Sequence, residues 1–343
     1  MKNLKYQLFC ISLLALTCAS TQCKAQKSNA FLLALSKADH TLAIVDPTTL
    51  KVIARIPVGE DPHEVIASSD GKTAYVTIYG GGAFHEINVL DLVAQKALTT
   101  VDTRPLYGPH GIVFVNGKVW FSAEGSKSVG RYDPSIGKVD WSMGTGQDRT
   151  HMIYVTNDSK RIYTTNVSSG TVSILVDTLI QPPPNAPAGA RAREDWIQTL
   201  VPTARGSEGF DVSPDGKELW TASAENGMIS IVDPIAKKGV GTIDAKVLGA
   251  NRLIFTPNGN LVFISSLGSG DLTIYDARSR ALVKKLPIGH GAAGILMDPD
   301  GSRAFVACSP DNYVVVIDLK TLEVTSHIDV GKTPDGLAWA VRR

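Results

Sequence analysis

Residues 206–233 read GSEGFDVSPDGKELWTASAENGMISIVD. A short apolar run leads into the pair Asp215-Gly216, a second apolar run follows, and after a polar loop a third run ends at Asp233. Short runs of β-branched and aromatic residues, separated by Asp, Asn and Gly, are typical of β-strands joined by turns. A fourth run precedes the next copy of this pattern, so the segment predicts a unit of four antiparallel strands.

The same unit recurs along the chain. The turn between the first two strands returns as pairs that favour tight two-residue hairpins: Asp70-Gly71, Asn116-Gly117, Asp158-Ser159, Asp215-Gly216, Asn258-Gly259 and Asp300-Gly301. The aspartate that ends the third strand returns, at spacings of 45, 42, 44, 56, 43 and 42 residues, as Asp46, Asp91, Asp133, Asp177, Asp233, Asp276 and Asp318. Four short strands repeated about every 40 residues predict the blades of a β-propeller.

Both ends of the chain contribute to one further blade. Six complete units run from about residue 62 to residue 330, with three strands predicted before them at 31–35, 41–46 and 51–56, and one after them at 335–340. The leading strands lack an innermost partner, and the trailing strand supplies it. The predicted fold class is therefore all-β: a seven-bladed β-propeller with four antiparallel strands per blade, closed by both chain ends, which leaves no open sheet edge.

The repeats carry a family resemblance. Pro-Asp-Gly turns occur at 214–216 and 299–301, the second strands begin Tyr75-Val-Thr-Ile and Tyr163-Thr-Thr-Asn, and third strands end in Ile-Asp or Val-Asp. In these features the chain, over residues 29–343, resembles the YVTN family of bacterial extracytoplasmic propellers. The resemblance implies the fold. It says little about function, because such folds host binding proteins, lactonases, lyases and metal enzymes alike.

The N-terminus has the pattern of a secretory signal peptide. Lys2 and Lys5 precede the apolar run 8–16, which is too short to span a bilayer, and small and polar residues follow it. Cleavage is expected after Ala25, leaving residues 26–343 as the propeller in the periplasm or outside the cell. A lipoprotein anchored through Cys18 or Cys23 is the less favoured alternative.

Composition limits the partners. Beyond the leader only Cys308 remains, so no disulfide framework is expected. Removing the leader would take three lysines and no acids from a chain of net charge +1, leaving −2. A nearly neutral chain lacks the basic footprint of nucleic-acid binding, and no later segment is long and apolar enough for a membrane span. We expect a monomer whose partner is a small polar molecule or an extracytoplasmic protein.

One unit is longer than the others. Residues 181–193, QPPPNAPAGARAR, are inserted between its third and fourth strands. Proline-rich composition predicts a loop and not a second domain. Because the connections from third to fourth strands open away from the innermost-strand starts, the loop is expected on the face opposite the histidines described next.

Polar residues begin the innermost strands. The equivalent pairs are His63-Glu64, His110-Gly111, His151-Met152, Glu208-Gly209, Asn251-Arg252, Ala293-Gly294 and Asp335-Gly336. Their first residues should ring one mouth of the central channel. Successive blades then place His63, His110 and His151 side by side, with Glu208 next. His85 falls in a loop of the same face.

These residues suggest a metal centre. Three imidazoles that leave a coordination position open are a catalytic arrangement for zinc, and they also suit other divalent transition metals. In this hypothesis His63, His110 and His151 are the ligands of one divalent transition metal, and Glu208 is a further ligand or a general base.

Two other interpretations use the same residues. In a metal-free pocket, the ligand-binding side chains would be His63, Glu64, His85, His110, His151, Arg205, Asn251 and Asp335. Glu208 and Arg252 would be catalytic if the chain is an enzyme, and a guanidinium at the channel suits a carboxylate or phosphate. Alternatively, the histidines only bond backbone or water at the rim.

Two classes of function follow. The first is a secreted YVTN-type propeller that binds a small polar ligand or a partner at the histidine-rich mouth. The alternative is a metal-dependent hydrolase, lactonase or lyase. Imidazoles that converge on one centre would favour the second class, so the sequence leaves open whether the chain is an enzyme.

Overall fold

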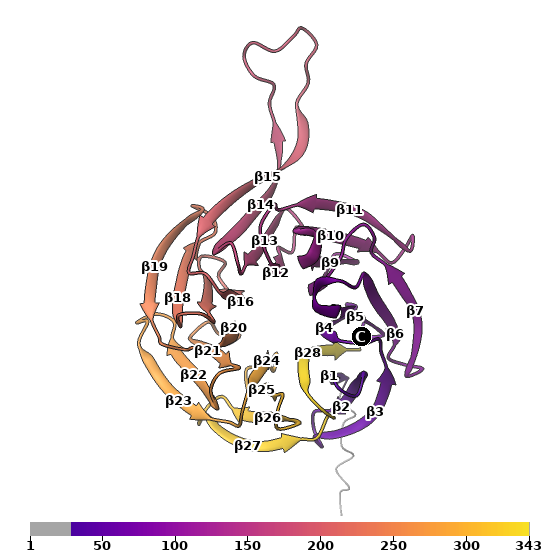
Figure 1. Cartoon of the computed structure of the whole chain (residues 1–343), viewed down its shortest axis with the longest axis vertical. Coiled ribbons are helices and arrows are strands. Elements are labelled where there is room, and N and C mark those ends of the chain that lie inside the picture. Colours follow the sequence, from indigo (N-terminus) through magenta and orange to yellow (C-terminus); the bar gives the residue numbers. More distant parts are fainter. Residues whose placement is uncertain (1–28, 343) are drawn as a thin grey trace, which may run out of the picture.

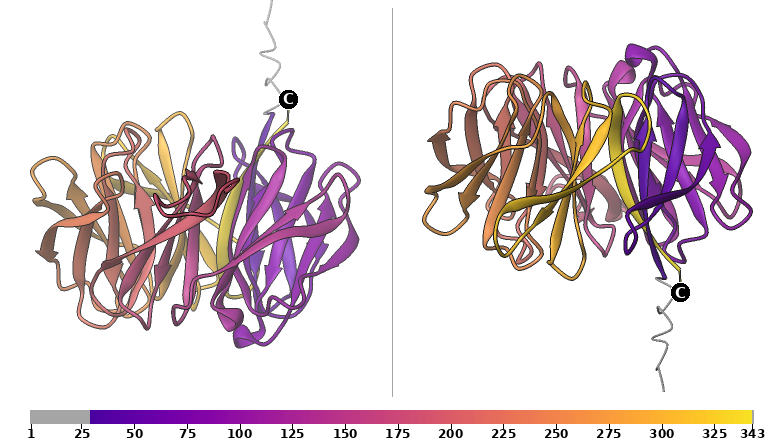
Figure 2. Two further views of the ribbon diagram at one scale, coloured as in Figure 1. Left: turned by 90° about the horizontal axis from the view of Figure 1, so that it is seen from above. Right: turned by 90° about the horizontal axis from the view of Figure 1, so that it is seen from below.

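The computed structural model describes residues 29–342, so the signal-peptide and lipoprotein predictions lie outside the described residues. Within that range, seven four-stranded antiparallel sheets surround a central axis (Figure 1). Side views show a disc, with the C-terminal end on one face and two short helical turns on the other (Figure 2). The predicted seven-bladed propeller is confirmed.

The strands follow the predicted order. Blade 1 contains β28 (Pro334–Val341), β1 (Ala30–Ser36), β2 (Thr41–Asp46) and β3 (Lys51–Pro57). Blades 2 and 3 contain β4 (Pro62–Ala67), β5 (Thr73–Ile78), β6 (Glu86–Asp91) and β7 (Lys96–Asp102), then β8 (Pro109–Val115), β9 (Lys118–Ala123), β10 (Ser128–Asp133) and β11 (Lys138–Gly144). Blades 4 and 5 contain β12 (Thr150–Val155), β13 (Arg161–Asn166), β14 (Thr171–Ile180) and β15 (Arg193–Pro202), then β16 (Ser207–Val212), β17 (Leu219–Ser223), β18 (Met228–Asp233) and β19 (Lys238–Asp244). Blades 6 and 7 contain β20 (Ala250–Phe255), β21 (Leu261–Ser266), β22 (Asp271–Asp276) and β23 (Leu282–Pro287), then β24 (Ala292–Met297), β25 (Arg303–Cys308), β26 (Tyr313–Asp318) and β27 (Glu323–Ile328). The helical turns are η1 (Gly80–Gly82) and η2 (Glu124–Ser126).

Blade 1 closes the ring. β28 pairs with β1 in antiparallel register, with Leu32 opposite Trp339 and Ala30 opposite Val341. The first described strand is thus held by the last one, as the sequence predicted. Because each end supplies strands that the other lacks, the blade forms only when both ends meet.

The core lies between the blades. The middle strands β2, β18, β22 and β26 all have a run of four buried residues, and outermost strands such as β11 and β27 alternate between exposed and covered positions. One cluster joins blades 1 and 2 and another joins blades 7 and 1. Middle strands with both faces covered read as continuous apolar runs. The repeated apolar runs of the sequence are these strands.

The turns differ in part from the prediction. Asn116-Gly117 directly joins β8 to β9 as a two-residue turn. The other pairs stand inside longer loops. In four of these loops a Ser or Thr bonds to the Asp or Asn two positions on, as Ser68 Oγ does to Asp70 Oδ1 at 2.6 Å, whereas Asp298 stands at that position before Asp300. The second residue of each pair still has positive φ, which explains the Gly preference.

The insertion forms an arm. β14 and β15 extend past the blade as a hairpin, with Ile180 opposite Arg193, and the proline-rich residues 181–192 form its tip. Figures 1 and 2 show the arm projecting outward from the circumference, so the expectation that it lies on the face opposite the histidines is corrected. The strands pair beyond the blade because β-branched and apolar residues continue up to the first proline. Across residues 29–342, no helix is long and apolar enough to cross a membrane.

Candidate metal and ligand site at the channel mouth

A β-bulge places the site residues on each innermost strand. In β4, Pro62 pairs with Ile78 and Val65 pairs with Val76, so His63 and Glu64 stand where the register shifts. The same shift follows the first residue of β8, β12, β16, β20 and β24. A bulge bends a strand and re-aims its side chains. It therefore turns the polar residues of successive blades towards the channel.

Hydroxyl groups replace the lost ladder bonds. In blade 2 the backbone N–H of Glu64 donates to Thr77 Oγ1 at 3.1 Å, and the Thr77 hydroxyl donates to the carbonyl of His110 in blade 3 at 2.8 Å. Ser122 bonds the N–H of Gly111 and the carbonyl of His151 in the same way. Each hydroxyl thus fastens the bulge of its own blade to the site residue of the next.

Glycine follows several site residues because neighbouring strands approach closely there. A Cβ on Gly294 would lie 2.2 Å from the carbonyl oxygen of Asp335, and one on Gly336 would lie 2.4 Å from that of His63. The His-Gly, Ala-Gly and Asp-Gly pairs of the sequence therefore reflect packing around the axis. Glu64 and Arg252 occupy the same strand position and carry long side chains into the channel.

The mouth holds a cavity of about 300 Å³. Its walls are formed by Lys37, His63, Tyr79, His110, Arg149, His151, Glu208, Asn251, Arg252, Leu267, Ala293, Ser309, Thr333 and Asp335. The set brings together His63, His110, His151, Glu208, Asn251, Arg252 and Asp335, which the sequence placed around one mouth. Glu64 is reached through its ion pair with Arg252.

Two residues proposed as ligand-binding lie elsewhere. His85 Nδ1 is 3.2 Å from Asp102 Oδ1, and the ring packs edge-on against Tyr107, outside the cavity walls. Arg205 is exposed, and its side chain lies beside Gly170. Both residues are in loops on the same face as the channel mouth, as predicted, but neither lines the cavity.

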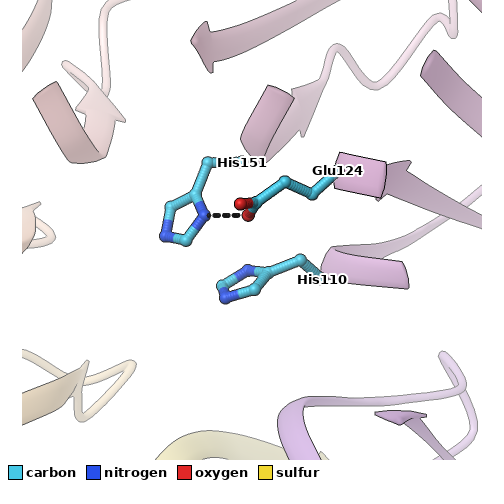
Figure 3. A group of neighbouring side chains, drawn as sticks. All are labelled: His110, Glu124 and His151. Carbon is cyan, nitrogen blue, oxygen red and sulfur yellow. Dashed lines mark hydrogen bonds and ion pairs between the residues drawn. The ribbon is translucent and has the colours of Figure 1, made fainter. Parts of the chain in front are cut away.

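Two histidines and one carboxylate converge (Figure 3). Ligand atoms of His110, Glu124 and His151 all lie within 4.8 Å of one another, and all three residues are buried. His151 Nδ1 and Glu124 Oε2 are hydrogen-bonded at 2.8 Å, and the His110 ring packs against the His151 ring at a tilt of 33°, with centroids 3.9 Å apart. His110 Nδ1 is buried and has no hydrogen-bond partner among residues 29–342. The group has the composition of a metal site.

The protonation states suit metal binding. Burial, followed by the nearby His151 and His63, holds the pKa of His110 well below its ordinary value, so the ring is neutral. Burial alone would raise the pKa of Glu124, but the hydrogen bonds and charges of His151 and Arg149 outweigh it and lower this pKa to about 2. A neutral imidazole and an ionised carboxylate are the forms that bind metals.

Glu124 is oriented by two donors. The Tyr79 hydroxyl donates to Glu124 Oε1 at 2.9 Å, and Arg149 Nε donates to the same oxygen at 2.8 Å. Burial and the Glu124 carboxylate raise the pKa of Tyr79, so its phenol stays protonated. Oε2 then faces His151. Outer hydrogen bonds of this kind fix the ligands in metal sites.

His63 belongs to a different group. Lys37 Nζ lies 3.0 Å from both ring nitrogens of His63 and 3.0 Å from Asp61 Oδ1. The hydrogen bond of His63, with Lys37 nearby, holds the pKa of Asp61 well below its usual range. An ammonium group at the nitrogen edge of His63 would repel a metal ion. The structure thus groups His110 and His151 with Glu124, where the sequence grouped them with His63.

An ion pair joins two blades at the cavity. Arg252 of blade 6 binds Glu64 of blade 2, and both side chains are nearly buried. Beside it, Asn251 Nδ2 donates to Glu208 Oε2 at 3.0 Å. Burial opposes ionisation of Arg252, but Glu64, Asp335 and Glu208 together raise its pKa. The pair therefore links blades 2 and 6 at the cavity wall.

The sequence interpretation missed a second ring. The residue that follows each second strand is Lys37, Tyr79, Glu124, Val167, Ala224, Leu267 or Ser309. Their spacing repeats with the blades, and Lys37, Tyr79, Leu267 and Ser309 line the cavity while Glu124 joins the cluster. Their common position directly after a second strand is the signal in the sequence that identifies them.

Comparisons with known proteins support the fold. No family model matches the sequence. An alignment 151 positions long, which covers 38% of this chain, is 28% identical to Antigen Lp49 of Leptospira interrogans, and it covers 33% of that protein. Hydrazine synthase of Kuenenia stuttgartiensis superposes with a TM-score of 0.66 at 17% identity, over 81% of this chain and 89% of that chain. A Bacteroides uniformis protein named as a candidate 6-phosphogluconolactonase gives 0.70 at 16% identity, over 92% and 100%. At such identities the likeness to solved structures shows the propeller fold alone.

Proposed function

We propose that this propeller binds a small polar molecule at the channel mouth and does so with a divalent transition metal held by His110, Glu124 and His151. The proposal includes the extracytoplasmic location and the YVTN-type ancestry that the sequence predicts. Two imidazoles and a carboxylate form a donor set that zinc and related metals accept, with positions left for a ligand.

The His110 ring carries this proposal. Its Nδ1 is buried without a hydrogen-bond partner among the described residues, beside the Glu124 carboxylate. A buried polar atom without a partner costs free energy, commonly about 1–3 kcal/mol, and so calls for an explanation. A metal ion that takes the place of the proton between His151 and Glu124 would bind this nitrogen as well.

The net charge around the mouth also favours a bound cation. The charged residues that line the cavity, with their ion-pair partners, are three cations and five carboxylates: Lys37, Arg149 and Arg252 against Asp61, Glu64, Glu124, Glu208 and Asp335. Carboxylates gathered around a partly enclosed cavity attract cations. A divalent ion would balance this excess of two negative charges.

The test is metal content after zinc loading and dialysis, measured by elemental mass spectrometry. We expect about one zinc ion per parent chain and essentially none in His110→Ala. The matched control is His327→Ala, because His327 is exposed on the outermost strand β27 and should retain the metal. A zinc-free parent, or a His110→Ala chain that binds zinc as the parent does, would contradict the proposal.

A second candidate function is metal-dependent hydrolysis, as of a lactone. Glu208 favours it, because this carboxylate lines the same cavity on the blade that follows His151. A bound metal would lower the pKa of a water molecule, and a nearby carboxylate can accept the proton. Turnover of uncharged lactones by the zinc-loaded chain, lost in Glu208→Gln while zinc is retained, would distinguish hydrolysis from binding alone.

A further inference from the structure

The cavity has two unlike sides. Histidine, tyrosine and charged side chains from blades 2 to 5 form one side. Blades 6 and 7 contribute the uncharged Leu267, Ala293 and Ser309, together with Asn251 and Arg252 of β20. The Arg252 guanidinium is paired with Glu64. Ala293 stands where three other blades carry histidine. The space for a ligand therefore lies over Ala293, with the proposed metal site across from it.

Every cation at the mouth already has carboxylate partners. Lys37 Nζ lies 3.0 Å from Asp61 Oδ1 and 3.5 Å from Asp335 Oδ2. Arg149 lies 2.8 Å from Glu124 and 3.5 Å from Glu208. Arg252 is paired with Glu64. Among the described residues that line the cavity, no cation is left to pair with a phosphate or a carboxylate.

Three of the residues that line the cavity offer acceptor oxygens. Asp335 and Glu208 present carboxylate oxygens, and Ser309 presents a hydroxyl whose proton goes to the carbonyl of Pro334. Carboxylates accept hydrogen bonds from hydroxyl groups and repel anions. The volume of about 300 Å³ is at the lower end for small-molecule sites, which suits a single ring.

We infer that the ligand of the channel mouth is an uncharged, polyhydroxylated molecule the size of one sugar ring, such as a monosaccharide or its lactone. This inference rests on the proposed function, since the metal ion balances the surplus carboxylates and leaves the loaded mouth neutral. Hydroxyl groups donate to Asp335 and Glu208, the ring lies over Ala293, and one oxygen is directed towards His110 and His151. Phosphorylated and carboxylated sugars are rejected, because the anion would face those carboxylates.

The experiment is a calorimetric titration of the zinc-loaded full chain with a panel of neutral monosaccharides and their lactones, each beside its phosphate ester and its sugar acid. We expect the tightest binder to be neutral and its phosphate or acid form to bind about tenfold or more weakly, as an unpaired charge in a partly buried site requires. A tightest binder that is anionic would overturn the inference.

A matched pair of variants locates the ligand. Leu267→Trp would fill the uncharged side of the cavity and should abolish sugar binding without loss of zinc. Leu282→Trp, at a leucine of similar exposure (50% against 52%) on the outermost strand of the same blade, should bind as the parent does. A loaded parent that binds no member of the panel, or equal binding by Leu267→Trp, overturns the inference while the metal proposal stands. A parent without zinc overturns the proposed function itself.

Discussion

At the residue scale, one half-buried carboxylate lies outside the proposed site and breaks the pattern of its strand position. Asp211 of β16 stands where the other innermost strands carry apolar residues, for example Ile66 and Leu296. Its carboxylate accepts the N–H groups of Phe255, in the next blade, at 2.9 Å and of Val212 at 2.8 Å. Burial is the main reason that the pKa of Asp211 is raised to about 6.

This shift predicts a pH dependence of stability. The folded state takes up a proton at Asp211 near pH 6, whereas an unfolded Asp does so near roughly 3.9, so the folded state binds more protons between these values. The contribution of Asp211 to the free energy of unfolding therefore rises as the pH falls from 7.5 to 5. Asp211→Asn should lack this rise. We therefore expect the thermal midpoint of Asp211→Asn to fall relative to that of the parent as the pH falls from 7.5 to 5.

The measurement is the difference in midpoint between Asp211→Asn and the parent across this pH range, because other titrating groups contribute to both chains equally. Asp140→Asn, which removes an exposed ion pair with Arg131, is the control and should leave the pH dependence unchanged. A constant difference between Asp211→Asn and the parent would show that Asp211 titrates as in the unfolded chain.

At the scale of the element, the bulge and its hydroxyl form one device that builds the site. The hydroxyl stands at the same position in blades 2, 3, 4 and 6, as Thr77, Ser122, Thr165 and Ser265, and in each case it bonds the carbonyl of the next blade's site residue. The positions of His110 and His151 thus depend on side chains that never touch a ligand.

Ser122 gives the sharpest test of this device. Ser122→Ala would leave the N–H of Gly111 and the carbonyl of His151 buried without their partner, which commonly costs about 1–3 kcal/mol. We expect a lower denaturant midpoint and weaker zinc binding. Ser122→Thr keeps the hydroxyl in a form that blades 2 and 4 already use, and it should restore both properties. Equal stability of the alanine variant and the parent would remove the hydroxyl from this role.

Repetition made the strands and the innermost-strand ring predictable, because each blade repeats the same turn residues and apolar runs. The sequence pattern did not predict Glu124, Tyr79 and Lys37 as site residues. The residue type at this position differs from blade to blade, and only the common position after a second strand links the three. The pairing of His63 with Lys37 depends on side-chain packing across two blades, which no spacing in the sequence encodes.

At the scale of the whole molecule, two segments should differ in what they contribute to stability: β28, which closes the ring, and the arm, which projects from it. β28 supplies the innermost strand of blade 1, so its loss would leave an open sheet edge and an unfilled position at the axis. The tip of the arm, by contrast, lies beyond Ile180 and Arg193, and its hydrogen bonds are local, such as that from Ala186 N to Pro183 O at 2.9 Å.

The two segments therefore predict different truncation phenotypes. Replacing residues 181–192 with Asn-Gly should close the hairpin at Ile180 and Arg193 with a turn that suits two-residue loops. The base of the arm stays anchored, because Trp196 packs against Trp141 of blade 3 with ring centroids 5.1 Å apart. We expect the free energy of unfolding to change by no more than a surface substitution would change it, about 0.5 kcal/mol, and zinc content to be unchanged. Deleting residues 334–343 should instead abolish cooperative unfolding and zinc binding together. An arm-free chain that loses stability or zinc would show that the projection helps to hold the ring closed.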